Sequence, residues 1–259
     1  MILDEILSHK RREIQKNRLD VPEAILLKEI HALPRTRSLS ARIASSEGPR
    51  TRVIAEIKKA SPSCGVIRED FDSQLLARQY DDAGAAAISV VTESHFFQGG
   101  LHVLKAVRAV STLPLLRKDF VIDPYQILEA RYHGADAVLL IARIVPVGLL
   151  AELVQFACSL GMEALVEVHN EDELARAQST GSRLIGVNNR DLSTFKIDVG
   201  ISERLAQRAA PEVILVSESG INDRQQILRL QAAGIRAFLI GETLMKAPDP
   251  GQRLKELLE

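Results

Sequence analysis

Six charged or amide side chains of this sequence stand where chemistry is expected, at or beside the ends of apolar segments. They are Glu56, Lys58, Lys118, Glu167, Asn188 and Glu218. Successive side chains of a β-strand point to opposite faces, so Glu56 and Lys58 would share the face of Ile54. An unpaired ionised group is costly in an apolar interior, which predicts that the six meet in one polar cavity. Lysines and carboxylates held together shift one another's pKa values and can act as general acids and bases.

A ring of ion pairs that only stabilises the fold is the alternative interpretation of these six residues. We favour the acid–base interpretation, because buried ion pairs contribute little net stability. Neither a metal nor a cofactor is expected at this site. The histidines show no H-E-x-x-H or comparable ligand spacing, and Cys158 lies in an apolar segment.

Two glycine-containing segments could bind a phosphate group. They are Ser217-Glu218-Ser219-Gly220-Ile221 and Ile240-Gly241-Glu242-Thr243-Leu244-Met245. Glycine lets backbone N–H groups approach phosphate oxygens, and a helix N-terminus adds partial positive charge. The side chain of Glu242 would have to point away from such an anion. Ordinary tight turns are the alternative for both segments.

Two further segments have the composition of loops at the same cavity. Residues 60–65, Ala-Ser-Pro-Ser-Cys-Gly, are suited to turns and predict an active-site loop in which Cys64 is incidental. Residues 96–100, Phe-Phe-Gln-Gly-Gly, could pack an aromatic substrate or could instead pack beneath their own loop. His169 is predicted to be a loop residue without a role.

The elements that would position these residues repeat along the chain. Glycine stands four residues before an apolar strand centre at Gly84, Gly134, Gly161, Gly181 and Gly234, which predicts a helix, a glycine cap and a buried strand. The helices are expected at 73–83, 124–133, 147–160, 171–179 and 223–233. The strands are expected at 52–57, 86–91, 114–118, 136–141, 163–167, 184–188, 213–217 and 237–241. Continuous apolar strands favour a parallel sheet, so the α/β pattern predicts a TIM barrel, a (β/α)8 fold, with an open doubly wound sheet as the alternative.

Residues 1–50 precede the first strand and form a helical N-terminal extension of the single barrel domain expected over 1–259. The apolar stripe of Leu3, Ile6, Leu7 and Ile14 predicts one helix, and 38–46 predicts a short second one. This extension could close the bottom of the barrel or contribute to the substrate cavity. Lys10-Arg11-Arg12 is expected to be a solvated helix face.

The overall charge limits the partners that the chain can have. The sequence holds 33 Lys plus Arg against 34 Asp plus Glu, for a net charge of −1. This balance gives no reason to expect nucleic acid or a membrane as a partner. Two cysteines and no apolar run of membrane-spanning length predict a cytoplasmic protein. We expect a monomer, with a weak homodimer as the alternative.

Six motifs, in order along the chain, resemble those of indole-3-glycerol phosphate synthase. They are Glu56-Ile57-Lys58-Lys59-Ala60-Ser61-Pro62-Ser63, Leu116-Arg117-Lys118-Asp119-Phe120, Asp123-Pro124-Tyr125-Gln126-Ile127, Leu165-Val166-Glu167-Val168-His169, Gly186-Val187-Asn188-Asn189-Arg190-Asp191-Leu192 and Ser217-Glu218-Ser219-Gly220-Ile221. A departure is Cys64, where many members carry a basic residue. The resemblance implies a cofactor-free step of tryptophan biosynthesis, in which 1-(2-carboxyphenylamino)-1-deoxyribulose 5-phosphate closes a ring, loses carbon dioxide and loses water.

The resemblance also implies roles for individual residues. Lys118 would be the general acid at the ketone oxygen, and Lys58 would hold the substrate carboxylate and protonate the leaving hydroxyl. Glu167, assisted by Glu56, would stabilise the cationic intermediate, Asn188 would hydrogen-bond the substrate, and Glu218 would support the lysines. The implied phosphate-binding residues are Ser219, Gly220, Gly241 and Glu242 (through its backbone). The implied ring-binding residues are Ser61, Phe97, Phe120, Leu139, Arg190 and Leu192.

Two other classes of function remain as alternatives. Phosphoribosylanthranilate isomerase and the tryptophan synthase α-type lyases are phosphosugar barrels that could share the glycine segments. Neither explains the motifs that hold Lys58, Lys118 and Glu167. A phosphate-ligand sensor without activity is the other class, and the intact acid–base residues argue against it.

Overall fold

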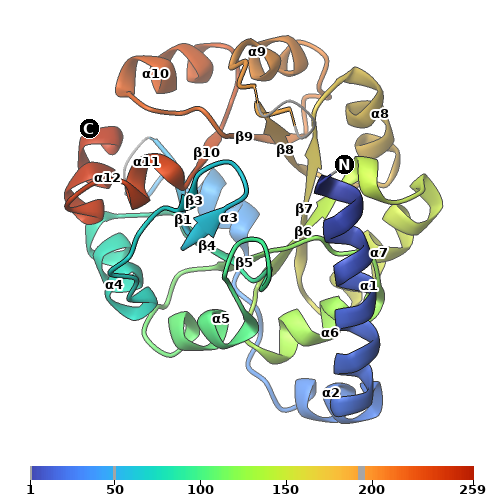
Figure 1. The fold of residues 1–259 in the computed structure, drawn as a ribbon. Helices are drawn as coiled ribbons and strands as arrows, with labels where there is room; N and C mark the ends of the chain where they lie inside the picture. The colour runs from blue at the N-terminus through green and yellow to red at the C-terminus, as the bar shows by residue number, and fades with distance from the viewer. Residues whose placement is uncertain (1, 49–50, 192–195) are drawn as a thin grey trace.

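The computed structural model describes residues 2–48, 51–191 and 196–259, and within these ranges eight parallel strands form a closed barrel in the order β1-β10-β9-β8-β7-β6-β5-β4. Figure 1 looks down this barrel. The strands are β1 Val53–Ile57, β4 Ala87–Val91, β5 Leu115–Lys118, β6 Ala137–Ile141, β7 Glu163–Val168, β8 Leu184–Asn188, β9 Ile214–Glu218 and β10 Ala237–Ile240. The predicted (β/α)8 barrel is therefore confirmed, and the open-sheet alternative is wrong.

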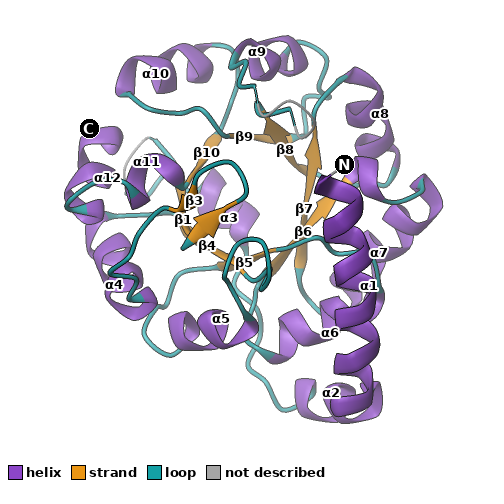
Figure 2. Cartoon of the chain, in the orientation of Figure 1, coloured by secondary structure: helices purple, strands orange, loops and turns teal. Residues whose placement is uncertain are grey.

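Helices surround the ring of strands on all sides (Figure 2). They are α4 Ser73–Ala83, α5 Leu101–Arg108, α6 Pro124–Tyr132, α7 Val147–Ser159, α8 Glu171–Ser179, α9 Gly200–Ala206, α10 Arg224–Ala232, α11 Glu242–Met245 and α12 Pro250–Leu258, with a 3₁₀ turn η1 at Ala142–Ile144. The repeated glycines close the helices as predicted. Gly84, for example, ends α4 with a φ of 89°, which a side chain with a Cβ rarely adopts.

The alternation of side chains along each strand divides the core into two layers. In β1, Val53, Ala55 and Ile57 pack outward against the helices, while Ile54 points into the barrel interior. Glu56 has the inward parity of Ile54 and comes one step closer to the carboxyl end of the strand. The same parity places the other polar strand-end residues at the mouth of the barrel, above its apolar interior.

The N-terminal segment serves both ends of the barrel. It forms α1 Ile2–Asp20, α2 Glu23–Ile30 and α3 Leu39–Ala44. Leu39 and Ile43 of α3 are buried in the inner apolar cluster, and α3 is seen through the barrel at its far end (Figure 1). Helix α1 crosses in front of the ring, and its Ile6 joins the same cluster. The extension therefore closes the bottom and also reaches the mouth, so both predicted roles apply.

A small hairpin lies in front of the barrel opening (Figure 2). It consists of β2 Ala60–Ser61 paired antiparallel with β3 Gly65–Val66. Arg68, just after it, donates hydrogen bonds to the carbonyl oxygens of Met245 and Ala247 and so ties the hairpin to the end of α11. In the parts of the chain that the structure describes, none of the helices has the length and apolar character needed to cross a membrane.

Candidate active site

The two lysines predicted for chemistry each sit among carboxylates at the barrel mouth. The Nζ atom of Lys58 lies 2.8 Å from Oε1 of Glu56, its neighbour on the same face of β1. The Nζ atom of Lys118, at the end of β5, lies 3.4 Å from Oε2 of Glu167 and 3.4 Å from Oε2 of Glu218. Lys118 therefore connects β7 with β9 across the opening.

Burial and these charges set the protonation of the cluster. Burial alone would lower the pKa of Lys118, but Glu218 and Glu167 outweigh it and raise that pKa, so the ammonium form is favoured. Burial would raise the pKa of Glu167, but the nearby Lys118 and His169 and hydrogen bonding to Asn188 lower it. Burial, together with the nearby Glu167 and Glu56 charges, raises the pKa of Glu218 despite the lowering by Lys118. Around Lys118 the pKa shifts of the two carboxyl groups are therefore opposed: ionisation of Glu167 is favoured and ionisation of Glu218 is disfavoured.

Gly186 of β8 makes room for the carboxyl group of Glu218. A Cβ atom on Gly186 would come within 2.0 Å of Oε1 of Glu218. Because this oxygen is the end of a flexible side chain, the Gly186→Ala protein should fold with Glu218 pushed away from Lys118. We expect kcat to fall at least about tenfold, or about 1.4 kcal/mol of transition-state stabilisation.

The matched control for Gly186→Ala is Gly148→Ala in α7, where an added Cβ meets no atom within 4 Å. Steady-state kinetics and thermal unfolding of both variants would separate loss of activity from loss of fold. A Gly186→Ala enzyme with unchanged kcat would show that the position of Glu218 does not matter for turnover.

Two adjoining cavities lie beside this cluster. The first, here called the aromatic cavity, includes Glu56, Lys58, Ser61, Phe97, Lys118, Phe120, Leu139, Glu167, Asn188, Arg190, Ser219 and Glu242, with Ile2, Leu3 and Ile6 of α1. The second, here called the glycine cavity, includes Glu218, Ser219, Gly220, Gly241, Glu242 and Thr243. Glu56, Lys58, Lys118, Arg190, Ser219 and Glu242 line both. The structure thus brings together every predicted site residue that it describes, and Leu192 lies outside the described residues.

The aromatic cavity has an apolar wall. The rings of Phe97 and Phe120 lie 6.1 Å apart, between their centroids, at an interplanar angle of 45°. Leu139 and the apolar side chains of α1 continue this wall. Of the two phenylalanines at 96 and 97, Phe97 lines this cavity, whereas Phe96 makes ring contacts with His9 and His95 outside it. An aromatic ring held here would lie next to the two lysines.

The glycine cavity combines a turn of uncommon backbone conformation with side chains of both charges. Ser219 and Gly220 both have positive φ angles, 66° and 79°, and both line this cavity. Gly241 is needed because a Cβ there would come within 2.4 Å of Oε1 of Glu56. Glu242 accepts a hydrogen bond from Arg190 at 2.9 Å and one from Lys246 at 2.6 Å. These two cations compensate the negative charge of Glu242, which would otherwise repel a phosphate.

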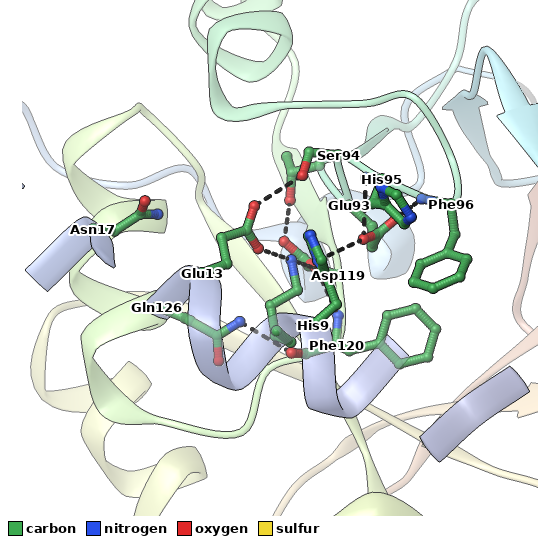
Figure 3. Close-up of polar contacts among 12 residues, drawn as sticks. His9, Glu13, Asn17, Glu93, Ser94, His95, Phe96, Asp119, Phe120 and Gln126 are labelled. Atoms are coloured by element: carbon green, nitrogen blue, oxygen red, sulfur yellow. Dashed lines mark hydrogen bonds and ion pairs between the residues drawn. The ribbon is translucent and has the colours of Figure 1, made fainter. Parts of the chain in front are cut away.

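A buried charge network behind the mouth was not expected from the sequence, and the prediction that Lys10 is solvated was wrong. Lys10 of α1 is 1% exposed, and its Nζ lies 2.9 Å from Oδ1 of Asp119. The other Asp119 oxygen accepts hydrogen bonds from Arg117 at 2.9 Å and Thr92 at 2.7 Å. Figure 3 shows Asp119 between α1 and the strand ends. Asp119 directly follows Lys118, so this network fixes the end of β5.

Glu93 organises the loop that carries Phe97. Its carboxylate accepts hydrogen bonds from the backbone N–H groups of His95, Phe96 and Phe97, at 3.2, 2.6 and 3.0 Å (Figure 3). The carboxylate thereby replaces the backbone partners that a tight turn lacks. Its position two residues after β4 is a signal in the sequence, because a carboxylate there can cap the following N–H groups.

His169 also has contacts that its expected place in a loop did not indicate. It lies in the bend after β7 but is buried, with Nε2 3.5 Å from Oε1 of Glu167 and Nδ1 3.1 Å from Oε2 of Glu173. The spacing of His169 and Glu173, four residues apart at the start of α8, is the signal that could have predicted this pair.

Comparisons with known proteins agree on one family over nearly the whole chain. The family model described as indole-3-glycerol phosphate synthase matches residues 3–257. The indole-3-glycerol phosphate synthase of Rhodopirellula baltica is 45% identical over 257 residues, covering 99% of this chain and 98% of the relative. That of Carboxydothermus hydrogenoformans is 46% identical over 264 residues and is covered completely, as is this chain.

Solved structures with lower identity share the fold. A mutant tryptophan synthase α-subunit from Pyrococcus furiosus matches with a TM-score of 0.61 at 16% identity, covering 81% of this chain and 98% of that one. A thiamine phosphate pyrophosphorylase from the same organism matches with a TM-score of 0.60 at 14% identity, covering 81% and 94%. At these identities the likeness supports the barrel architecture alone.

Proposed function

The chain belongs to the indole-3-glycerol phosphate synthase family, and from that premise we propose how its residues divide the reaction between them. The enzyme is a carboxy-lyase of tryptophan biosynthesis. It converts 1-(2-carboxyphenylamino)-1-deoxyribulose 5-phosphate to indole-3-glycerol phosphate, with ring closure, loss of carbon dioxide and loss of water. The observation that carries our proposal is the position of Lys118 between two carboxyl groups, 3.4 Å from each.

Lys118 acts as the general acid of ring closure. The ring carbon that bears the carboxylate attacks the ketone carbon, and the ketone oxygen must receive a proton as the new bond forms. The ammonium group of Lys118 is held by Glu167 and Glu218 at the mouth, where it can donate that proton. Glu218, which retains its own proton, is placed to restore the ammonium form afterwards.

Lys58 and Glu56 act on the two leaving groups. Lys58 binds the substrate carboxylate until carbon dioxide departs, and it then protonates the hydroxyl group that leaves as water. Glu56, 2.8 Å from Lys58, holds the ammonium group in place. The positive charges of Lys58 and Lys118 lower the pKa of Glu56 despite its burial, so it remains an anion beside them.

Glu167 accepts the last proton. Ring closure leaves a cationic intermediate, and loss of the hydroxyl group leaves the new five-membered ring with one carbon-bound proton in excess. An ionised carboxylate can stabilise the cation and then take up that proton. Asn188 hydrogen-bonds the substrate beside it, and its Oδ1 accepts the backbone N–H of Arg190 at 3.0 Å.

The two cavities hold the two ends of the substrate. We assign the aromatic ring to the cavity lined by Phe97, Phe120 and Leu139, with Ser61 and Arg190 at its polar edge. We assign the phosphate to the glycine cavity, at the backbone of Ser219, Gly220, Gly241 and Glu242. This cavity follows β9 and β10, the last two barrel strands, where phosphates are commonly bound in this fold.

A direct test of the function is the rise of indole fluorescence when the protein is mixed with the carboxyphenylamino substrate. The proposal predicts continuous turnover without added metal or cofactor. Binding of the substrate without any rise in fluorescence would instead indicate a sensor, and it would contradict the assigned acid–base roles.

Ser219→Asp tests the phosphate assignment. The new carboxylate would stand beside the substrate phosphate, so we expect KM to rise at least about tenfold, equal to about 1.4 kcal/mol of binding, with kcat little changed. Ser219→Asn is the matched control, because both Asp and Asn tolerate the positive φ of this position. Equal KM values for the two variants would place the phosphate elsewhere.

Three further properties complete the proposal. We propose that residues 1–259 work as one barrel domain, with 1–50 as its helical extension, because α1 lines the substrate cavity. We also propose a cytoplasmic, monomeric enzyme whose partner is its small phosphorylated substrate and not a nucleic acid or a membrane. Light scattering at micromolar protein concentration would distinguish the monomer from a weak homodimer.

A further inference from the structure

His169 lies between two carboxylates, one of which belongs to the active site. Its Nε2 atom is 3.5 Å from Oε1 of Glu167, and its Nδ1 atom is 3.1 Å from Oε2 of Glu173. Among the residues that the structure describes, Nε2 has no hydrogen-bond partner. The side chain is 5% exposed, so water reaches it poorly. A buried imidazole that bridges two acidic groups in this way needs a physical reason.

Glu173 is fixed independently of the ring and remains charged. Its Oε2 atom accepts a hydrogen bond from the backbone N–H of His169 at 2.8 Å. Its Oε1 atom accepts hydrogen bonds from Arg143 at 3.1 Å and from Asn170 at 3.0 Å. Burial opposes ionisation of Glu173, but His169 and Arg143 lower its pKa to about 2. Helix α8 thus begins with an immobile anion that faces Nδ1 of the histidine.

The two oxygens of Glu167 face different basic side chains. Lys118 approaches Oε2, and His169 approaches Oε1. Both imidazole nitrogens donate a proton only in the imidazolium form, and that form suits a ring with a carboxylate at each nitrogen. The groups that bear on this ring are Glu167 on β7, Glu173 on α8, Arg143 on η1 and Lys118 on β5.

We propose that His169 is a positioning residue for Glu167: anchored by Glu173, it holds the Glu167 carboxylate ionised and turned toward Lys118. This inference rests on the proposed function, because it assigns its effect to the carboxylate that accepts the last proton. The chain Arg143–Glu173–His169–Glu167–Lys118 then links the loops after β6 and β7 to the general acid.

His169→Asn tests the proposal, because asparagine is smaller and uncharged. Loss of a cation within reach of Glu167 should raise the apparent pKa of that carboxylate by about one unit. The acidic limb of the kcat–pH profile should therefore move about one unit to higher pH. Because the Glu167 carboxylate also loses the group that turns it toward Lys118, kcat at neutral pH should fall about tenfold with KM within about twofold. Glu173→Gln, which keeps the shape of the anchor but removes its charge, should shift the limb in the same direction by less.

The matched control is His133→Asn, at the end of α6. His133 is also a partly buried histidine with an unpartnered Nδ1 among the described residues, but it is not part of either cavity. We expect its pH profile to match that of the wild type. A lower kcat in His169→Asn with an unmoved acidic limb would mean a merely structural role, and it would overturn the proposal.

A second readout needs no turnover. The carboxyl carbon of Glu167, assigned by comparison with Glu167→Gln, can be titrated by NMR in the wild type, His169→Asn and Glu173→Gln. A higher Glu167 titration midpoint in both variants than in the wild type supports the proposal, and midpoints equal to that of the wild type overturn it. If His169→Asn folds poorly, Glu173→Gln alone decides between these results. Failure of the wild type to turn over the substrate would instead count against the proposed function, because the NMR titration does not depend on it.

Discussion

Replacing Lys118 by alanine is expected to lower kcat by at least about 10²-fold, the usual effect of losing a general acid. Without the ammonium group of Lys118, no proton donor is placed at the ketone oxygen, since Lys58 is held at Glu56 on β1. The variant should still fold, because the remaining carboxyl groups can hold one more proton in place of the lost positive charge. Indole fluorescence measures the loss of turnover, and circular dichroism checks the fold.

Lys105→Ala is the control for this experiment, because Lys105 is an exposed lysine on α5. It makes the same change of charge without touching either cavity. Turnover of Lys118→Ala within a fewfold of the Lys105→Ala value would remove Lys118 from the mechanism. A large rise in KM at constant kcat would give it a binding role in place of the acid role.

The barrel was predictable because its signals are local and repeated. A glycine such as Gly84 ends a helix at a fixed distance before five of the eight strands, and apolar residues lie on both faces of strands such as β1. The expected strand limits agree with the structure within one residue, for example 184–188 for β8. The barrel in turn places strand ends together, so the meeting of Lys58, Lys118 and Glu167 followed from topology.

The partners of buried polar residues were not predictable in the same way. Lys10 stands in a basic run whose pattern indicates solvent, yet Asp119, more than a hundred residues away, holds it in the interior. His169 follows a strand as loop residues do, and its burial depends on how α8 begins. For Lys10 the outcome is decided by a partner far along the chain. For His169 the spacing to Glu173 is a local signal for the pair, but the burial of the ring is decided by packing, which local spacing does not record.

The role of two glycines at the site was only partly predictable from the sequence. Gly186 and Gly241 are visible in the sequence as positions without a side chain, but the structure adds what occupies the space. A carboxyl group, of Glu218 in one case and Glu56 in the other, fills the volume where a Cβ would lie. These glycines are therefore part of the acid–base cluster, although neither has a group that reacts.

Replacing Asp119 by alanine is expected to lower the free energy of unfolding by about 3–5 kcal/mol, the usual cost of removing one partner from a buried ion-pair network. Asp119 binds Lys10, Arg117 and Thr92, and its Oδ1 accepts the backbone N–H of Phe120 at 2.8 Å. Its removal therefore loosens α1, the end of β5 and the Phe120 side of the aromatic cavity together. Urea unfolding measures the change, and kcat should fall because Lys118 is the preceding residue.

A double-mutant cycle with Lys10→Met isolates the ion pair from the rest of this effect. In the wild-type background, Lys10→Met leaves Asp119 with Arg117 and Thr92, but it removes the contact that joins α1 to β5. In the Asp119→Ala background the same change removes an ammonium group that has lost this partner, so it should cost at least about 1 kcal/mol less. Additive effects in the cycle would show that Lys10 and Asp119 do not stabilise each other.

The pH dependence gives an independent check on the same residue. Burial would raise the pKa of Asp119, but Lys10 and Arg117 hold it well below its ordinary value. Its stabilising effect is therefore complete above the unfolded-state pKa of about 4 and is lost as the pH falls toward the lower folded-state value. The stability difference between the wild type and Asp119→Ala should stay constant from pH 7 down to about 4 and shrink below that. A difference that stays constant at still lower pH would mean that packing, and not charge, makes Asp119 stabilising.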